Sequence, residues 1–355
     1  MSFSPSTHSS SPSVAAAASE GPSTTGTRKL LGLLLVAAAL AIVVPASLAL
    51  GSNPLPWDEV WHGLWWPDDS EASIIVWTLR VPRTVLAIVA GVAAGVAGAL
   101  IQAVTRNPLA DPGILGVNAG AGFAVTIGVA AFGVTTIDGF LWFAFVGAML
   151  ATIAVYLIGS AGRGSVAPVQ LVLAGVALGA VLGGVSTFLT LIDKETFRTL
   201  RHWGLGSVAA ASLEETLTVL PFLLVGLALA LLIAGSLNAV ALGDELATSL
   251  GASVLRTRLL GIIAVTLLAG GETALTGGIG FVGLMVPHVV RWFTGPDQRW
   301  ILGFTILTAP VVVLAADIVG RVIARPGEIE VGILTAVVGA PVLIALVRRR
   351  KASGL

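Results

Sequence analysis

Long apolar stretches recur along almost the whole chain, and they constrain its fold more than any other feature. A bilayer core about 30 Å thick needs about twenty apolar residues, because an α-helix rises about 1.5 Å per residue. Ten segments of this kind occur, and the eighth is too short to cross without help from its flanks. They span residues 30–50, 82–104, 113–132, 140–159, 168–192, 213–235, 257–275, 279–293, 300–320 and 330–347. The sequence therefore predicts an all-α integral membrane protein with about ten transmembrane helices.

The composition agrees with a protein that lies in a lipid bilayer. Hydrophobic residues make up 56% of the chain and charged residues 11%, against about 45–50% and about 25% in soluble domains. The formal net charge is zero, so the chain lacks the basic field that nucleic-acid binding requires, and we expect no nucleic-acid partner. The sequence has no cysteine, which excludes disulfides and thiolate metal sites.

The distribution of lysine and arginine predicts the orientation of the chain, because cytoplasmic loops carry more of them. With the amino terminus inside, twelve of the 19 lie in inner loops or tails, so we expect both termini to be cytoplasmic. Residues 1–27 are rich in Ser, Pro and Thr and are expected to form a disordered cytoplasmic tail. Residues 28–355 then form the ten-helix domain. Residues 51–79 hold five tryptophans, which favours a helix at the outer membrane interface.

Five blocks of sequence share a recognisable pattern, and they follow one another in a fixed order. The blocks are LRVPRTVLAIVAGVAAGVAGALIQAVTRNPLADPGILGVNAGAG at 79–122, LGDELATSLG at 242–251, GGIGFVGLMVPHVVR at 277–291, GPDQR at 295–299 and ADIVGRVIARPGEIEVGILTAVVGAPVLIALVRRR at 316–350. Together they closely resemble the FecCD family, the permease subunits of ABC importers for iron–siderophores, haem and cobalamin. The blocks cover well over a third of the chain, so the resemblance is specific.

The resemblance implies a type II importer fold, a bundle like that of the cobalamin importer permease, in the inner (cytoplasmic) membrane. It implies a second permease copy or a paralogue around a central pathway, two cytoplasmic ATPase subunits and an external substrate-binding lipoprotein. The chain itself is expected to be no enzyme and to bind no cofactor, because ATP–Mg would be used by the ATPase. No GxxxxGK[ST] phosphate loop occurs in it. The expected cargo is an iron(III)–siderophore, the commonest in the family, with haem or cobalamin as alternatives.

The resemblance also assigns residues that face the partner proteins. Residues 236–256 read as two short helices joined by a turn, and they match the cytoplasmic coupling loop that docks into the ATPase. An ordinary capped loop is the alternative. Arg80, Arg83 and Arg321 match arginines that meet acidic residues of the binding protein, and Arg325 is the weaker substitute for Arg321. These arginines could instead anchor their helices at the lipid headgroups. The ATPase-coupling residues are Leu242, Gly243, Asp244, Glu245, Ala247, Leu250 and Gly251.

A third group of residues is expected along the pathway or at its gates. Residues 107–116 match the inner gate of the family. They fit equally well a sharp reversal of the chain with Asp111 as a helix cap. Gln102 and Asn118 could line the pathway, and polar packing between helices explains them equally well. The pathway and gate residues are Asn107, Pro108, Gly116, Asn118, Gly280, Gly283 and Pro287.

Two acidic residues, Glu272 and Asp317, enter or border the predicted spans, where charge is costly, so both are functional candidates. Their positions near outer helix ends favour solvation at the interface. His288 has no second ligand at metal-binding spacing, so we expect a structural or gating role and no metal site. An ion-coupled secondary transporter is the rival function, although a clear buried charge pair for it is lacking. An intramembrane enzyme is disfavoured, because GxSxG and HExxH are absent.

Overall fold

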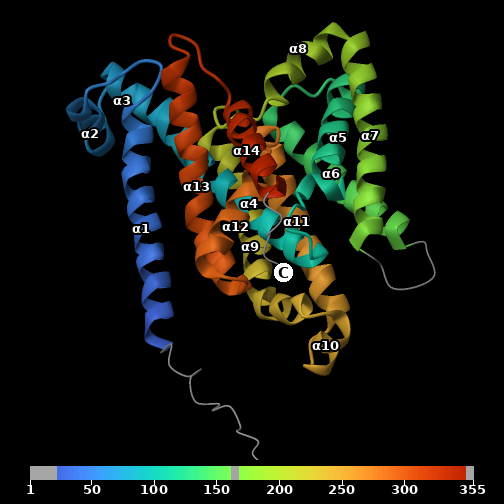
Figure 1. Ribbon diagram of the computed structural model, residues 1–355. Helices are drawn as coiled ribbons and strands as arrows, with labels where there is room; N and C mark the ends of the chain where they lie inside the picture. The colour runs from blue at the N-terminus through green and yellow to red at the C-terminus, as the bar shows by residue number, and fades with distance from the viewer. Residues whose placement is uncertain (1–21, 161–167, 349–355) are drawn as a thin grey trace, which may run out of the picture.

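A computed structural model describes residues 22–160 and 168–348, and these residues form a bundle of helices (Figure 1). Each of the ten predicted spans falls mainly on one helix, and the third span, 113–132, also includes the 3₁₀ helix η2 (Pro112–Leu115). The helices are α1 (Pro22–Ala49), α4 (Val81–Thr105), α5 (Val117–Phe132), α6 (Ile137–Ser160), α7 (Pro168–Ile192), α9 (Leu213–Ala241), α11 (Val254–Thr276), α12 (Val282–Thr294), α13 (Gln298–Ile323) and α14 (Val331–Arg348). Most of the predicted tail lies outside the described residues, and α1 begins six residues before the predicted boundary at 28.

Within the described residues, seven helices are long and apolar enough to cross a bilayer, and α5 and α14 are shorter apolar helices. Helix α12 has 13 residues, in agreement with the prediction that the eighth span is too short. The all-α membrane fold predicted from the sequence is thus confirmed. The second span is longer than predicted, because α3 (Glu71–Ile75) and the π-helix η1 (Val76–Arg80) continue directly into α4.

Short helices mark the two ends of the bundle. The end that carries α2 (Trp57–Trp65), α3 and α8 (Lys194–Trp203) is called the outer end, and the end that carries α10 (Asp244–Ser249) is called the inner end (Figure 1). Helix α2 confirms a helix in the tryptophan-rich loop. The prediction of two short helices within 236–256 is wrong in one respect, because residues 236–241 form the last turns of α9. Leu237 and Val240 are buried there, so the packing of α9 continues past the polar residues.

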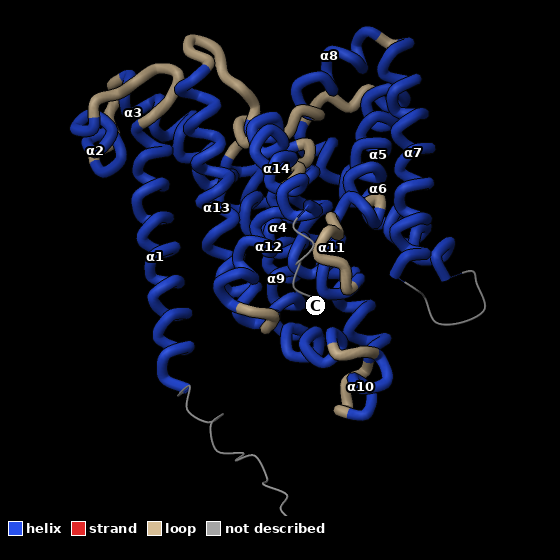
Figure 2. Tube along the Cα trace, viewed as in Figure 1, coloured by secondary structure: helices blue, strands red, loops and turns tan. Residues whose placement is uncertain are grey.

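Helix α4 lies at the centre of the bundle and packs against α9, α11, α12 and α13 (Figure 2). Its approach to α12 is the closest that glycine permits: a Cβ atom added at Gly98 would lie 1.9 Å from the carbonyl oxygen of Gly283. Two long helices lie at the flanks instead. Only 6% of the apolar window of α1 and 17% of that of α7 is buried. The polar residues described below lie mainly on the central helices.

Candidate functional site

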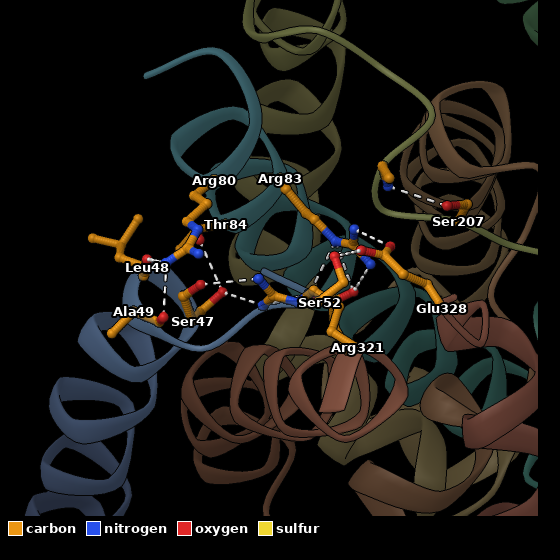
Figure 3. Close-up of polar contacts among 12 residues, drawn as sticks. Ser47, Leu48, Ala49, Ser52, Arg80, Arg83, Thr84, Ser207, Arg321 and Glu328 are labelled. Atoms are coloured by element: carbon orange, nitrogen blue, oxygen red, sulfur yellow. Dashed lines mark hydrogen bonds and ion pairs between the residues drawn. The ribbon is translucent and has the colours of Figure 1, made fainter. Parts of the chain in front are cut away.

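The structure brings Arg80, Arg83 and Arg321 together at the outer end, as Figure 3 shows. Arg83 pairs with two acids: its Nη2 lies 2.7 Å from Asp317 Oδ1, and its Nη1 lies 2.6 Å from Glu328 Oε2. Arg321 Nη2 lies 2.8 Å from the other oxygen of Asp317. We call these five residues the outer arginine cluster. Asp317 thus joins α4 to its own helix, α13, through two guanidinium groups.

Arg80 has a different set of partners. Its guanidinium donates to the carbonyl oxygens of Leu48 and Ala49 at 2.5 and 2.7 Å and to that of Asn53 at 2.5 Å. Arg321 likewise donates to the carbonyl and hydroxyl oxygens of Ser47 at 3.0 and 2.9 Å. These bonds hold the outer end of α1, and the chain after it, against the central helices.

Arg325, the substitute considered for Arg321, donates to the carbonyl oxygen of Gly51 at 2.7 Å. It therefore helps to hold the same turn after α1, and it does not replace Arg321 in the cluster. The turn is thus bonded by Arg80 at the end of η1 and by Arg325, which follows α13.

The cluster faces a cavity of about 740 Å³, which Arg80, Arg83, Arg321 and Glu328 line together with residues 209–212. Arg80 and Arg321 are almost fully buried, and the Arg83 side chain is 11% exposed. Burial opposes ionisation of Glu328, but the hydrogen bond and charge of Arg83 outweigh it and hold the pKa of Glu328 below its usual value. The cluster is a charged wall of the cavity and does not project from the surface.

Solvation of Asp317 at the membrane interface, which its position in the sequence favoured, is wrong. Asp317 has no exposed surface. Two arginines reach it instead, because α4 places Arg83 opposite it and Arg321 lies one helical turn further along α13. Burial of a carboxylate away from water is costly, and the two guanidinium groups offset that cost here.

Three predicted pathway residues, Asn118, Gly280 and Gly283, meet at a small cavity in the middle of the bundle. The cavity measures about 20 Å³, enough for about one water molecule. Asp111 and Glu272 also line it. We call this the central cavity. Two acidic residues and one amide therefore surround a space that no long side chain fills.

The segment that follows α4 reaches this cavity by turning back into the bundle. Asp111 lines the cavity beside Ala94, which lies eleven residues before the end of α4, or about 16 Å along its axis. Asp111 caps the 3₁₀ helix η2 (Pro112–Leu115) by accepting from the N–H of Gly113 at 2.8 Å. The Asp111 cap, one of the two interpretations of this segment, is present, but the segment is a surface turn only at its start.

Glu272 is 3% exposed, so its solvation at the membrane interface, the second interfacial prediction, is also wrong. Its Oε1 accepts from the hydroxyl of Thr276 at 2.7 Å and from the N–H of Ile279 at 2.8 Å. Thr276 ends α11 and Ile279 lies in the turn between α11 and α12, so the carboxylate holds this turn against the end of α11. No cation pairs with Glu272 among the described residues.

The other predicted gate residues do not line the central cavity. Asn107 and Pro108 lie at the inner end of α4, where the Asn107 side chain accepts from the N–H of Leu109. Gly116 has a φ of 71° and faces Val155 of α6. Pro287 is buried within α12.

A polar network that the sequence did not identify joins α4 to α12. Gln102 is fully buried and donates to the carbonyl oxygens of Gly283 at 3.3 Å and Leu284 at 3.1 Å. Its own oxygen accepts from Arg291 Nη2 at 3.3 Å. The packing role considered for Gln102 is therefore the one observed. His288, one turn before Arg291, is buried, and no group of metal-ligating side chains occurs among the described residues.

At the inner end, α10 presents the coupling residues. Leu242, Leu250 and Glu245 are exposed, whereas Ala247 is fully buried. Asp244 is bound to Arg106 and to Arg258, the latter at 3.1 Å.

Two glycines allow the sharp turns on either side of α10. Gly243 has a φ of 116° and Gly251 a φ of 83°, values that disfavour other residues. The result is a short helix that projects from the inner end with apolar side chains on its surface.

A model of the FecCD transport family matches residues 39–349. The chain belongs to this family. The ferric enterobactin transport system permease protein FepD of Escherichia coli is 46% identical to this FecCD permease over 92% of the chain and 95% of FepD. The hemin transport system permease protein HmuU of Yersinia pestis is 34% identical over 91% of the chain and 96% of its own length. The cobalamin import system permease protein BtuC of Halobacterium salinarum is 35% identical, with 89% of the chain and 88% of BtuC covered.

The solved structures agree with this membership. An inward-facing metal-chelate type ABC transporter matches this FecCD permease with a TM-score of 0.78 and 26% identity, over 89% of the chain and 98% of that structure. The protein is thus a multi-pass membrane permease with the type II importer fold and is not itself the catalytic subunit.

Proposed function

We propose that this permease moves iron(III)–siderophore complexes from an external binding protein into the cytoplasm, driven by ATP hydrolysis in separate subunits. The assignment of the cargo rests on the 46% identity to a ferric enterobactin permease along almost the entire chain. The relatives named for hemin and cobalamin are less similar. In this proposal the inner end faces the cytoplasm, both termini are cytoplasmic, and the protein lies in the inner membrane.

Helix α10 docks into the ATPase in this proposal. The exposed Leu246 of α10, the exposed Leu242 and Leu250 on either side of it, and the exposed Glu245 support the assignment. Exposed apolar side chains at the end of a helical bundle fit a protein partner better than water. Two ATPase subunits bind ATP–Mg, and this chain binds no cofactor.

Acidic residues of the binding protein approach the outer arginine cluster. Arg83 is the member that such an acid would reach, because Glu328, one of its present partners, is a third exposed. Arg80 and Arg321 hold the wall of the cavity in place through their hydrogen bonds to the end of α1 and the residues after it. The bonds of Arg80 to backbone carbonyls argue against the alternative of lipid headgroup anchoring.

The pathway of the proposal runs past the central cavity. Asn118, Gly280 and Gly283 meet there, and small residues allow helices to slide closely past one another. Asn107, Pro108, Gly116 and Pro287 then act in the flanking segments. A second copy of the permease, or a paralogue, completes the pathway.

Reconstitution in proteoliposomes tests the proposal. The permease is combined with its cognate ATPase and binding protein, and uptake of iron(III)–siderophore, haemin and cobalamin is measured with ATP inside. We expect uptake of the iron chelate alone, and none when the ATPase carries an inactivating substitution. Uptake of haemin or cobalamin in place of the iron chelate would overturn the proposed identity of the cargo. Uptake driven by an ion gradient without the ATPase would establish the secondary transporter instead.

A further inference from the structure

A single carboxylate at the inner end links three helices. Asp244 opens α10, and its Oδ1 accepts from Nη2 of Arg106 and from Nη2 of Arg258. Arg106 ends α4, and Arg258 lies near the start of α11. Among the described residues, both ion pairs of the inner end use this carboxylate. We call the three side chains the inner clamp.

Two features show that these contacts are specific to Asp244 and Arg106. Glu245, the next residue, is exposed and forms no ion pair within the described part of the chain. Arg106 has a φ of 49°, a left-handed conformation in which glycine or asparagine is the usual residue at the end of a helix. An arginine in this conformation is strained, because its Cβ atom crowds the backbone. The contact with Asp244 gives a physical reason for an arginine at this strained position.

The clamp is continuous with the polar network inside the bundle. Gln102, one turn before Arg106 on α4, is bonded to the first turn of α12 and to Arg291. The segment directly after Arg106 turns back to the central cavity, where Asp111 lies. Arg106 is therefore connected by continuous chain and hydrogen bonds both to α12 and to the segment that lines the cavity.

We propose that Arg106 and Arg258 are positioning residues that hold Asp244 and so make α10, α4 and α11 move as one body. Asp244 faces the bundle in this arrangement, and Glu245 with the exposed leucines forms the face that meets the ATPase. The inference rests on the proposed function, because it assumes that α10 receives the motion of the ATPase. It adds that the coupling passes through charge pairs inside this chain.

The complete complex, with ATPase and binding protein, tests the clamp in proteoliposomes. The variants are Asp244→Asn, Arg106→Gln, Arg258→Gln and the Asp244→Asn/Arg106→Gln pair. Arg256→Gln is the control, because Arg256 is an exposed arginine on the same helix as Arg258 and lies outside the clamp. The measurements are ATPase retained on the purified permease and iron(III)–siderophore transported per ATP hydrolysed.

We expect every variant to retain the ATPase. The three single clamp variants should transport about tenfold less chelate per ATP, the size of a typical coupling free energy. The pair should be no worse than Asp244→Asn alone, because Asp244→Asn already breaks the contact that Arg106→Gln removes. Arg106→Lys should recover part of the loss.

Normal transport per ATP in the clamp variants would overturn the proposal. Loss of ATPase binding in Asp244→Asn, with normal coupling in both arginine variants, would also overturn it, because Asp244 would then contact the ATPase itself.

A second measurement needs no partner protein. The chain has no cysteine, so spin labels can be placed at Ser249→Cys on α10 and Leu109→Cys beyond α4 in the otherwise unchanged permease. Asp244→Asn should broaden the distance distribution between the labels, and an unchanged distribution would refute the clamp. If the wild-type complex transports nothing, the proposed function fails, while the label distances still decide whether the clamp exists.

Discussion

Replacing Gly98 by alanine should force α4 and α12 apart. The new Cβ atom would lie 1.9 Å from the Gly283 carbonyl oxygen, whereas ordinary contact begins at 3.4 Å, so the helices must separate by about 1.5 Å. The new Cβ atom is fixed directly to the backbone of α4, and the oxygen belongs to the backbone of α12, so neither atom can rotate away. The same movement would break the bonds from Gln102 to the carbonyl oxygens of Gly283 and Leu284, which are already 3.3 and 3.1 Å long.

The size of the effect follows from these two losses. Overpacking costs about 1–3 kcal/mol, and a buried amide left without partners costs a further 1–3 kcal/mol or so. The unfolding midpoint of the purified permease, followed by tryptophan fluorescence on heating, should therefore fall by about 3–8 °C. Gly303→Ala is the matched control, because a Cβ atom at this position on α13 meets nothing within 4 Å. Equal midpoints for the two variants would refute the close approach of α4 and α12.

Two further predictions concern the outer arginine cluster. Asp317→Asn leaves the buried guanidinium groups of Arg83 and Arg321 without their shared carboxylate, which should cost about 3–5 kcal/mol. Its unfolding midpoint should lie well below that of Glu195→Gln, a change in an exposed ion pair, and similar midpoints would contradict the pairing. Glu328 has a lowered pKa, so its contribution to stability is fully present above its ordinary value of 4.5 and is lost as the pH falls through the folded-state pKa. The difference in midpoint between wild type and Glu328→Gln should be constant near neutral pH and disappear in acid; a difference that persists there would contradict the ion pair.

The helices were predictable from the sequence, whereas most of their polar contacts were not. Hydropathy identifies each span because a bilayer requires about twenty apolar residues from every crossing helix, whatever its neighbours are. It reports nothing of which polar side chains meet across helices. Asp317 and Glu272 were therefore assigned to the interface, while the structure buries both among donors from other segments.

The residues of the candidate site were predictable in part, because the resemblance to the family located the segments that carry them. Asn118, Gly280 and Gly283 meet at one cavity. The inner clamp remained hidden, because Arg106 and Asp244 are 138 residues apart and no local pattern connects them. The sequence also does not predict that the segment after α4 turns back to the central cavity. Prolines and a glycine signal the end of a helix, but they do not fix the direction of the chain beyond it.

The shortness of α5 gives its neighbour α7 a particular importance. With 16 residues, α5 rises about 24 Å, less than the thickness of a hydrocarbon core, and the returning segment with η2 makes up the difference. Backbone outside a regular helix cannot face lipid, because its amides would lose their hydrogen bonds. η2 packs against α7, which buries little of its own surface. Helix α7 thus shields the backbone of η2 from lipid. Without α7, amides with no hydrogen-bond partner would face the hydrocarbon of the bilayer.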